Sequence, residues 1–254
     1  MPITTKKEQY LLQPDATMYY FGIDKDTYPG NTFMYDMWVN TNIRFTGFYL
    51  GGTSTISGPC CHPTSSWMPA SNPSSVRTYL AGLGYGFAPL YVGQQYDNPN
   101  CPSCNALTYD QGGADARNAA QLMIAAGFPD LSVCFLDVEA GGTLPASLIS
   151  YISGWVYEMN NATGYWAGVY CSYESAGQIS TAVGSSNVTL WVWDLNIQGC
   201  QENTPFPTPN PASAYPAAKT LQYAQGCTIS NGVTTTSADL DSSLYSDPSR
   251  NPVQ

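Results

Sequence analysis

Charged side chains and histidine are scarce in this chain of 254 residues. Only 10% of the residues are charged, 18 acids outnumber 8 lysines and arginines, and His62 is the single histidine. The formal net charge of -10 repels phosphate backbones and anionic lipid surfaces, so we expect no nucleic-acid partner. No apolar run is long enough for a transmembrane helix, and we predict no membrane insertion. One histidine disfavours a Ser-His-Asp hydrolase and a histidine-rich metal centre, and we predict neither a cofactor nor a bound metal.

The even count of eight cysteines, with loop-like neighbours, favours an oxidising compartment. We therefore predict a secreted or extracellular protein. The N-terminus lacks the apolar stretch of a signal peptide, and we expect the signal peptide to be absent from this sequence. The loop segments "GPCCHP" (58–63) and "CPSC" (101–104) could form a zinc site, but disulfides are the favoured interpretation. Cys200 and Cys227 flank a proline-rich insertion and could be joined across it, whereas Cys134 is expected to be a buried free thiol facing a helix layer.

Short apolar, β-branched or aromatic runs recur along the chain, and each ends in polar or glycine residues. Between them, residues 113–129 and 144–164 carry apolar side chains at helical spacing. Alternating strands and helices predict a parallel sheet with right-handed crossovers. The predicted strands cover residues 18–24, 44–52, 86–95, 131–139, 165–172, 189–196, 220–226 and 236–244.

Eight strands in a chain of this length predict an α/β fold that closes as a single (β/α)₈ TIM-type barrel. An open, doubly wound sheet is the alternative, but no glycine-rich phosphate loop follows any of the strands. Residues 196–219 are rich in proline and predict a long loop, which makes the C-terminal half of the barrel irregular. The barrel is expected over residues 18–246, between tails over residues 1–17 and 247–254.

The run "CFLDVEAGG" (134–142) places two acids at the end of a predicted buried strand. Because side chains alternate along a strand, Asp137 and Glu139 point the same way, with Cα atoms about 6.5 to 7 Å apart. In a barrel they would face inward at the carboxyl end of the strand, where this fold builds its active sites. A surface acid pair that caps the following loop is the alternative interpretation. Other predicted strands also carry acids near their ends, namely Asp24, Asp194, Asp239 and Asp241.

These acids suggest a chemistry if they meet at one rim of the barrel. Crowded carboxylates raise one another's pKa, so one of them can stay protonated near neutral pH and donate its proton. Paired acids of this kind suit the cleavage of glycosidic bonds. Alternation along the last strand does not choose between Asp239 and Asp241.

Aromatic and polar side chains near the strand ends are candidates for contacts with sugar rings. Aromatic residues belong more often to the core, so a core position is the alternative for each aromatic candidate. The candidate substrate-binding residues are Tyr91, Gln94, Gln95, Tyr170, Trp193, Asp194, Gln222 and Tyr223.

Six motifs follow one another along the predicted strands: "YFGID", "FLDVE", "GVYCS", "LWVWDL", "LQYAQ" and "ADLD". Together they resemble the glycoside-hydrolase-like domain family of the Rv2525c-like type, which is related to the family 25 lysozymes. The resemblance runs from about residue 18 to 246 and implies an irregular (β/α)₈ barrel with an acidic cleft at the carboxyl ends of the strands. By motif match, it places the lysozymes' proton donor on Glu139 and their other acids on Asp137, Asp24 and Asp239. In those lysozymes the substrate is the bond after N-acetylmuramic acid in peptidoglycan.

We therefore predict a secreted, monomeric glycoside hydrolase that cleaves a polysaccharide or peptidoglycan-type glycan. Glu139 is the predicted general acid, held protonated by Asp137 and by partial burial. Asp24 and Asp239 are predicted to bind sugar or water and to stabilise developing positive charge. The alternatives are a catalytically weak or inactive barrel that binds carbohydrate, and a structural scaffold.

Overall fold

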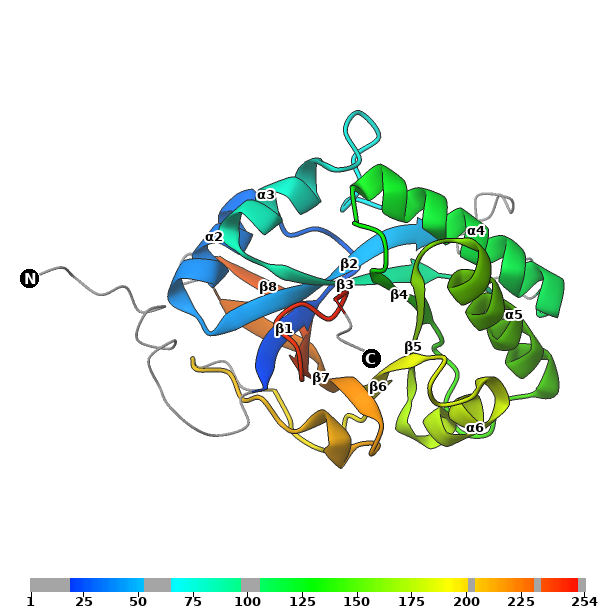
Figure 1. The fold of residues 1–254 in the computed structure, drawn as a ribbon. Coiled ribbons are helices and arrows are strands. Elements are labelled where there is room, and N and C mark those ends of the chain that lie inside the picture. Colours follow the sequence, from blue (N-terminus) through cyan, green and yellow to red (C-terminus); the bar gives the residue numbers. More distant parts are fainter. Residues whose placement is uncertain (1–18, 53–64, 97–105, 201–203, 231–233, 251–254) are drawn as a thin grey trace, which may run out of the picture.

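The structure is a computed structural model that describes residues 19–52, 65–96, 106–200, 204–230 and 234–250. Within these ranges, eight strands close into a barrel in chain order (Figure 1). The strands are β1 (Tyr20–Asp24), β2 (Ile43–Gly52), β3 (Gly86–Val92), β4 (Val133–Asp137), β5 (Trp166–Ser172), β6 (Thr189–Trp193), β7 (Ala218–Ser230) and β8 (Thr235–Ser243). The helices are α2 (Asn31–Asn40), α3 (Ser75–Leu83), α4 (Tyr109–Ala126), α5 (Ala146–Ala162), α6 (Tyr173–Val183) and the 3₁₀ turn η1 (Pro211–Ser213).

Each of the eight predicted strands is present, and the predicted α/β barrel is confirmed. The prediction of a parallel sheet is wrong for the last strand. β1 to β7 run parallel, but β8 is antiparallel to both β7 and β1. The connection from Ser230 to Thr235 is too short for a parallel crossover, which needs about a dozen residues or more. β7 and β8 therefore form a hairpin that completes the barrel.

The connection between β6 and β7 is the predicted long loop, and η1 is its helical turn. A disulfide between Cys200 and Cys227, with a Cα–Cα distance of 5.3 Å, ties this loop to β7 and confirms the predicted pairing. The two predicted helices correspond to α4 and α5, whereas α2, α3 and α6 were not predicted. The remaining cysteine segments, 58–63 and 101–104, lie outside the described residues.

Alternation along the strands separates the inside of the barrel from the layer beneath the helices. In β4, Val133 and Phe135 face the barrel interior, and Cys134 and Leu136 pack under the helices, as predicted. Cys134 is a buried free thiol, and Cys171 is a second one. The interior core consists of Phe45, Ala88, Leu90, Val133, Phe135, Tyr170 and Trp191.

The segment that follows β8 belongs to the packed structure rather than to a tail. The Asp247 side chain accepts a hydrogen bond of 3.0 Å from the Phe87 N–H. Ser249 is 2% exposed, donates its N–H to the Phe87 carbonyl and accepts the Val133 N–H, both at 2.7 Å. Residues 247–250 thus bridge β3 and β4, and the predicted boundary at residue 246 is too early.

Helices α4 and α5 pack closely because glycine lies at their contact. A Cβ atom built at Gly154 of α5 would collide with the Tyr109 carbonyl of α4, and one at Gly112 would collide with the Tyr151 carbonyl. Gly82 of α3, in contrast, has open space at the same position. A methyl group is therefore expected to destabilise the protein at Gly154 and to stabilise it at Gly82.

We expect Gly154→Ala to lower the free energy of unfolding by about 1–3 kcal/mol, because α4 and α5 must move apart. Gly82→Ala is the matched control and should raise it by about 0.5–1 kcal/mol, because alanine is the better helix former. Urea unfolding followed by circular dichroism measures both changes. Equal stability of the two variants would contradict the close contact.

Candidate active site

Five acidic side chains converge inside the barrel at the carboxyl ends of the parallel strands. We call them the acid cluster: Asp24, Asp137, Glu139, Asp239 and Asp241. Asp24 and Asp137 are the last residues of β1 and β4. β8 runs in the opposite direction, so its first half lies at this end, and Asp239 pairs with Asp24 in the strand register. Asp241 pairs with Gly22 one step deeper in the barrel.

The members of the acid cluster differ in depth. Asp241 is 0% exposed, Asp24 is 4% exposed and Asp137 is 5% exposed. Asp239 is half-buried, and Glu139, which follows β4, is exposed at the mouth. Glu139 and Asp239 are therefore the members of the acid cluster that are most accessible to solvent.

Asp24 and Asp241 form the deeper carboxyl pair. The Tyr49 hydroxyl donates to Asp24 Oδ1 at 2.8 Å, and the Trp191 indole N–H donates to Asp241 Oδ1 at 3.0 Å. The two carboxyls lie within hydrogen-bonding distance of each other, and the Oδ2 atom of each has no donor among the described residues. A proton shared between the two carboxyls satisfies both oxygens.

Burial and neighbouring charge shift the pKa values of this pair upward. Burial, followed by the charge of Asp239, raises the pKa of Asp24 to about 7, although its hydrogen bond from Tyr49 opposes the shift. Burial and the charge of Asp24 raise the pKa of Asp241 well above its usual range. The pair therefore keeps a proton near neutral pH.

Asp137 and Glu139 form the outer carboxyl pair. Gln95 holds their backbone, because its side chain donates to the Asp137 carbonyl at 3.0 Å and accepts the Glu139 N–H at 3.3 Å. Burial, followed by the charge of Glu139, raises the pKa of Asp137 well above its usual range. The pKa of Glu139 is also raised, first by the protein atoms crowded around it, while a hydrogen bond from Asp137 opposes this shift. In the free protein the proton rests on Asp137 and not, as predicted from the sequence, on Glu139, because the charge is better solvated on the exposed Glu139.

Asp239 is held by a separate network. It accepts the Gln222 side-chain N–H at 3.0 Å and the Gly226 N–H at 2.7 Å. Gln222 in turn accepts the Tyr170 hydroxyl at 2.5 Å. Burial raises the pKa of Asp239, and the two hydrogen bonds that it accepts oppose the shift. The network fixes the orientation of the carboxylate at the mouth.

Three of the predicted substrate-binding residues lie inside the barrel with the acid cluster: Tyr170, Gln222 and Trp193. Tyr170 and Gln222 are buried in the network just described. Trp193, at the end of β6, is half-buried, and its indole N–H has no partner among the described residues. The indole N–H is itself buried, so the part of Trp193 that a ligand can reach is its ring. Gln95, a fourth predicted residue, contacts the outer carboxyl pair through its hydrogen bonds to the backbone of Asp137 and Glu139.

The predictions that Tyr91, Tyr223 and Gln94 line the cleft are wrong. Tyr91 is fully buried beneath the helices and stacks on Trp155 of α5, with ring centroids 5.4 Å apart. Tyr223 is also fully buried outside the barrel and donates to the Pro207 carbonyl at 2.8 Å. Both alternate with inward-facing neighbours and so point outward.

Gln94 and Asp194 lie beyond the strands that precede them. Gln94 is 1% exposed and accepts the Ala106 N–H at 3.1 Å, so it fixes the start of the segment that leads to α4. Asp194 follows Trp193 and accepts the N–H and side-chain N–H of Asn196 at 3.1 and 3.2 Å. This loop cap accounts for Asp194 without a substrate contact.

Sequence reasoning left out three residues that shape the site: Tyr49, Trp191 and Gly47. Alternation along β2 could have identified Tyr49, because Phe45 and Gly47 face the same side. A Cβ atom at Gly47 would lie 2.5 Å from the Asp24 Cβ and 3.5 Å from the Trp191 ring. Glycine at this position therefore gives Asp24 and Trp191 the space that they occupy.

No group of three or more His, Cys, Asp or Glu side chains in the described ranges is arranged to hold a metal ion. No helix in the same ranges is long and apolar enough to cross a membrane.

A closed α/β barrel with clustered carboxyls at the strand ends defines a glycoside-hydrolase-like class of protein. The family model described as Rv2525c-like, glycoside hydrolase-like domain matches residues 36–243, and the chain belongs to this family. The resemblance inferred from the motifs is thus confirmed. No curated protein sequence matches the chain.

Solved structures share this fold at low sequence identity. An uncharacterized protein of B. stearothermophilus has a TM-score of 0.61 and 17% identity, over 87% of this chain and 94% of that one. The Tat-secreted protein Rv2525c of Mycobacterium tuberculosis, solved with HEPES, has a TM-score of 0.55 and 16% identity, over 92% and 97%. GHIP, a glycosyl hydrolase 25 of Streptococcus pneumoniae, has a TM-score of 0.56 and 11% identity, over 87% and 86%. These likenesses establish the fold that the chain shares with family 25 hydrolases.

Proposed function

We propose that the chain is a glycoside hydrolase that cleaves a cell-wall or other extracellular glycan, with muramidase-like activity as the first candidate. The observation that carries the proposal is the outer carboxyl pair, in which buried Asp137 and exposed Glu139 share a hydrogen bond at the barrel mouth. Glycosidic bond cleavage needs one carboxyl to donate a proton and a second to meet positive charge on the sugar. Membership of a glycoside-hydrolase-like family supports the same chemistry.

Glu139 is the proposed general acid. Glu139 is the more exposed acid of the outer carboxyl pair, so it is the one that a glycosidic oxygen can reach. A bound glycan excludes water from Glu139, which disfavours its negative charge and raises its pKa further. The proton that rests on Asp137 in the free protein then moves to Glu139, from which it passes to the leaving oxygen.

The same proton shift gives the other acids their proposed roles. Asp137 becomes negatively charged as positive charge develops at the anomeric carbon, and the two charges stabilise each other. Asp24 and Asp239 bind sugar hydroxyls or water and add negative potential. Trp193, which is half-buried at the end of β6, supplies a ring face for sugar stacking.

We also propose that the protein is secreted. The disulfide between Cys200 and Cys227 supports this proposal, because disulfides persist mainly in oxidising compartments.

The proposal is tested by incubating the protein with peptidoglycan, chitin and other wall glycans and measuring the reducing ends released. Mass spectrometry of the products identifies which bond is cut. Release from at least one glycan is expected. Binding of a glycan without release would replace the hydrolase with a carbohydrate-binding barrel, and the absence of both would leave the barrel as a scaffold.

A further inference from the structure

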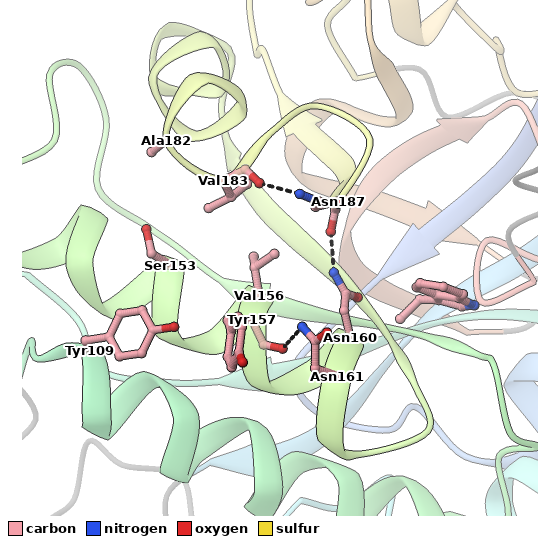
Figure 2. A pocket seen from close by; sticks show the side chains of 10 residues that line it. Tyr109, Ser153, Val156, Tyr157, Asn160, Asn161, Ala182, Val183 and Asn187 are labelled. Atoms are coloured by element: carbon pink, nitrogen blue, oxygen red, sulfur yellow. Dashed lines mark hydrogen bonds between the residues drawn. The ribbon is translucent and has the colours of Figure 1, made fainter.

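A groove on the helical face of the barrel lies apart from the acid cluster. It has a volume of about 570 Å³ and is lined by residues of α5 and α6, with Tyr109 contributed by the start of α4 (Figure 2). Trp166, the first residue of β5, and Asn187, which precedes β6, also line it. The groove thus reaches the amino ends of the strands, whereas the acid cluster lies at their carboxyl ends. The two sites are separate.

Two exposed tyrosines form one side of the groove. Tyr109 is 45% exposed and Tyr157 is 58% exposed. Their ring centroids are 6.4 Å apart, and the rings are tilted by 44°. Large aromatic rings are normally buried, so an exposed pair that lines a concave surface offers ring faces to a ligand.

Asparagine side chains on the other side of the groove are held in place by the backbone. Asn161 donates to the Tyr157 carbonyl at 2.7 Å, and Asn187 donates to the Val183 carbonyl at 2.8 Å (Figure 2). Among the residues that line the groove, no hydrogen bond drawn in Figure 2 involves the Oδ1 atoms of these two asparagines or the hydroxyls of Tyr109 and Tyr157. The groove therefore presents fixed acceptors and donors beside the aromatic rings, at little further cost in side-chain entropy.

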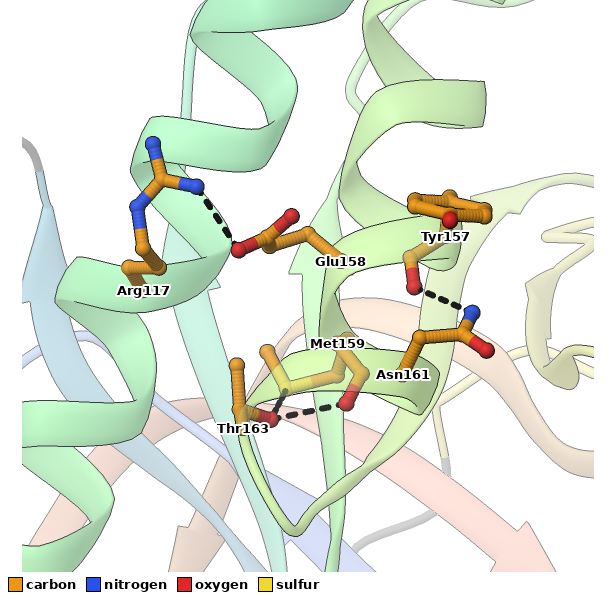
Figure 3. Close-up of polar contacts among 6 residues, drawn as sticks. All are labelled: Arg117, Tyr157, Glu158, Met159, Asn161 and Thr163. Atoms are coloured by element: carbon orange, nitrogen blue, oxygen red, sulfur yellow. Dashed lines mark hydrogen bonds and ion pairs between the residues drawn. The ribbon is translucent and has the colours of Figure 1, made fainter.

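The groove carries no charge, although the chain as a whole is acidic. None of its lining residues is Asp, Glu, Lys, Arg or His. The nearby ion pair between Arg117 and Glu158, at 2.7 Å, lies on the side of α5 away from Tyr157 and Asn161 (Figure 3). A charged polymer would find no counter-charge here, and an apolar helix would leave the amides unpaired. Ring faces next to amides and hydroxyls instead match a neutral sugar, which has apolar ring faces and hydroxyl edges.

We infer that this groove is an accessory binding site for a neutral oligosaccharide segment. It holds a glycan chain on the helical face, apart from the acid cluster. The inference rests on the proposed function for the role of this binding, but the binding itself depends only on the groove.

The test uses Glu139→Gln protein, in which cleavage of a bound glycan is strongly slowed under the proposed mechanism, and N-acetylchitohexaose or cellohexaose as the probe. The protein is made in a host without N-glycosylation, because Asn161 and Asn187 each begin an Asn-X-Thr sequon. NMR titration at millimolar sugar should shift the side-chain amide signals of Asn161 and Asn187. Adding Tyr157→Ala should weaken this binding about tenfold, the loss expected for one stacked ring. Tyr35→Ala is the matched control, because Tyr35 is 48% exposed on α2, outside the groove, and it should leave the binding unchanged.

The inference is overturned if neither sugar shifts the groove amides, or if Tyr157→Ala and Tyr35→Ala bind the sugar equally well. Its failure is distinct from failure of the proposed function. Release of reducing ends by the wild-type protein, without any shift of the groove amides, would preserve the hydrolase and reject the groove. Shifted groove amides without cleavage of any glycan would do the reverse.

Discussion

Glu139→Gln should lower kcat on the cleaved glycan by about 10²- to 10⁴-fold, the contribution of a positioned general acid. Glutamine keeps the size of the side chain but has no proton of suitable acidity to give to the leaving oxygen. Because Glu139 is exposed at the mouth, the variant should fold normally and still bind glycan. Initial rates of reducing-end release, measured beside binding of the same glycan, separate loss of chemistry from loss of affinity.

Glu158→Gln is the matched control for this experiment. It makes the same chemical change on α5, where Glu158 pairs with Arg117 at the surface and touches no member of the acid cluster. Its kcat should equal that of the wild-type protein. If Glu139→Gln also retained wild-type kcat, the proton would have to come from another acid, and the proposed role of Glu139 would be abandoned.

The strands were predictable because apolar and β-branched residues must cover both faces of a barrel wall. Within β4, alternation placed Phe135 inside and Cys134 outside, and it put Asp137 on the inner face. Helices α4 and α5 were predictable for a similar reason, because each carries an apolar stripe. α6 was missed because its buried face includes Ser175, Ala176 and Ser180, so small and polar residues weaken the pattern.

Other features depend on relations between strands that one sequence does not display. The direction of β8 follows from the hairpin with β7, and that direction brings Asp239 and Asp241 to the barrel mouth. Tyr91 and Tyr223 both lie near the ends of apolar runs. Their positions in the alternation along β3 and β7 nevertheless direct both side chains toward the helices and away from the barrel interior. The pairing of Asp24 with Asp241 joins the first and last strands, and only closure of the barrel brings them together.

Asp24→Asn should make the protein more stable at pH 8 while lowering its activity. Burial and the charge of Asp239 raise the folded-state pKa of Asp24 to about 7, against about 3.9 in the unfolded chain. Between these values the folded protein holds a proton that the unfolded chain has released, so stability falls as pH rises from about 4 to 7. The full shift corresponds to about 4 kcal/mol, lost progressively across that window and absent above it.

Asparagine has no proton to lose, so it should flatten the decline by up to about 1.4 kcal/mol per pH unit between pH 4 and 7. Urea unfolding at a series of pH values measures this slope, with Asp130→Asn as a control for an exposed acid outside the cluster. An unchanged slope in Asp24→Asn would show that Asp24 is an ordinary, solvated carboxylate. A flatter slope together with reduced turnover would show that the buried charge of Asp24 lowers stability above about pH 7 and that activity requires this carboxyl.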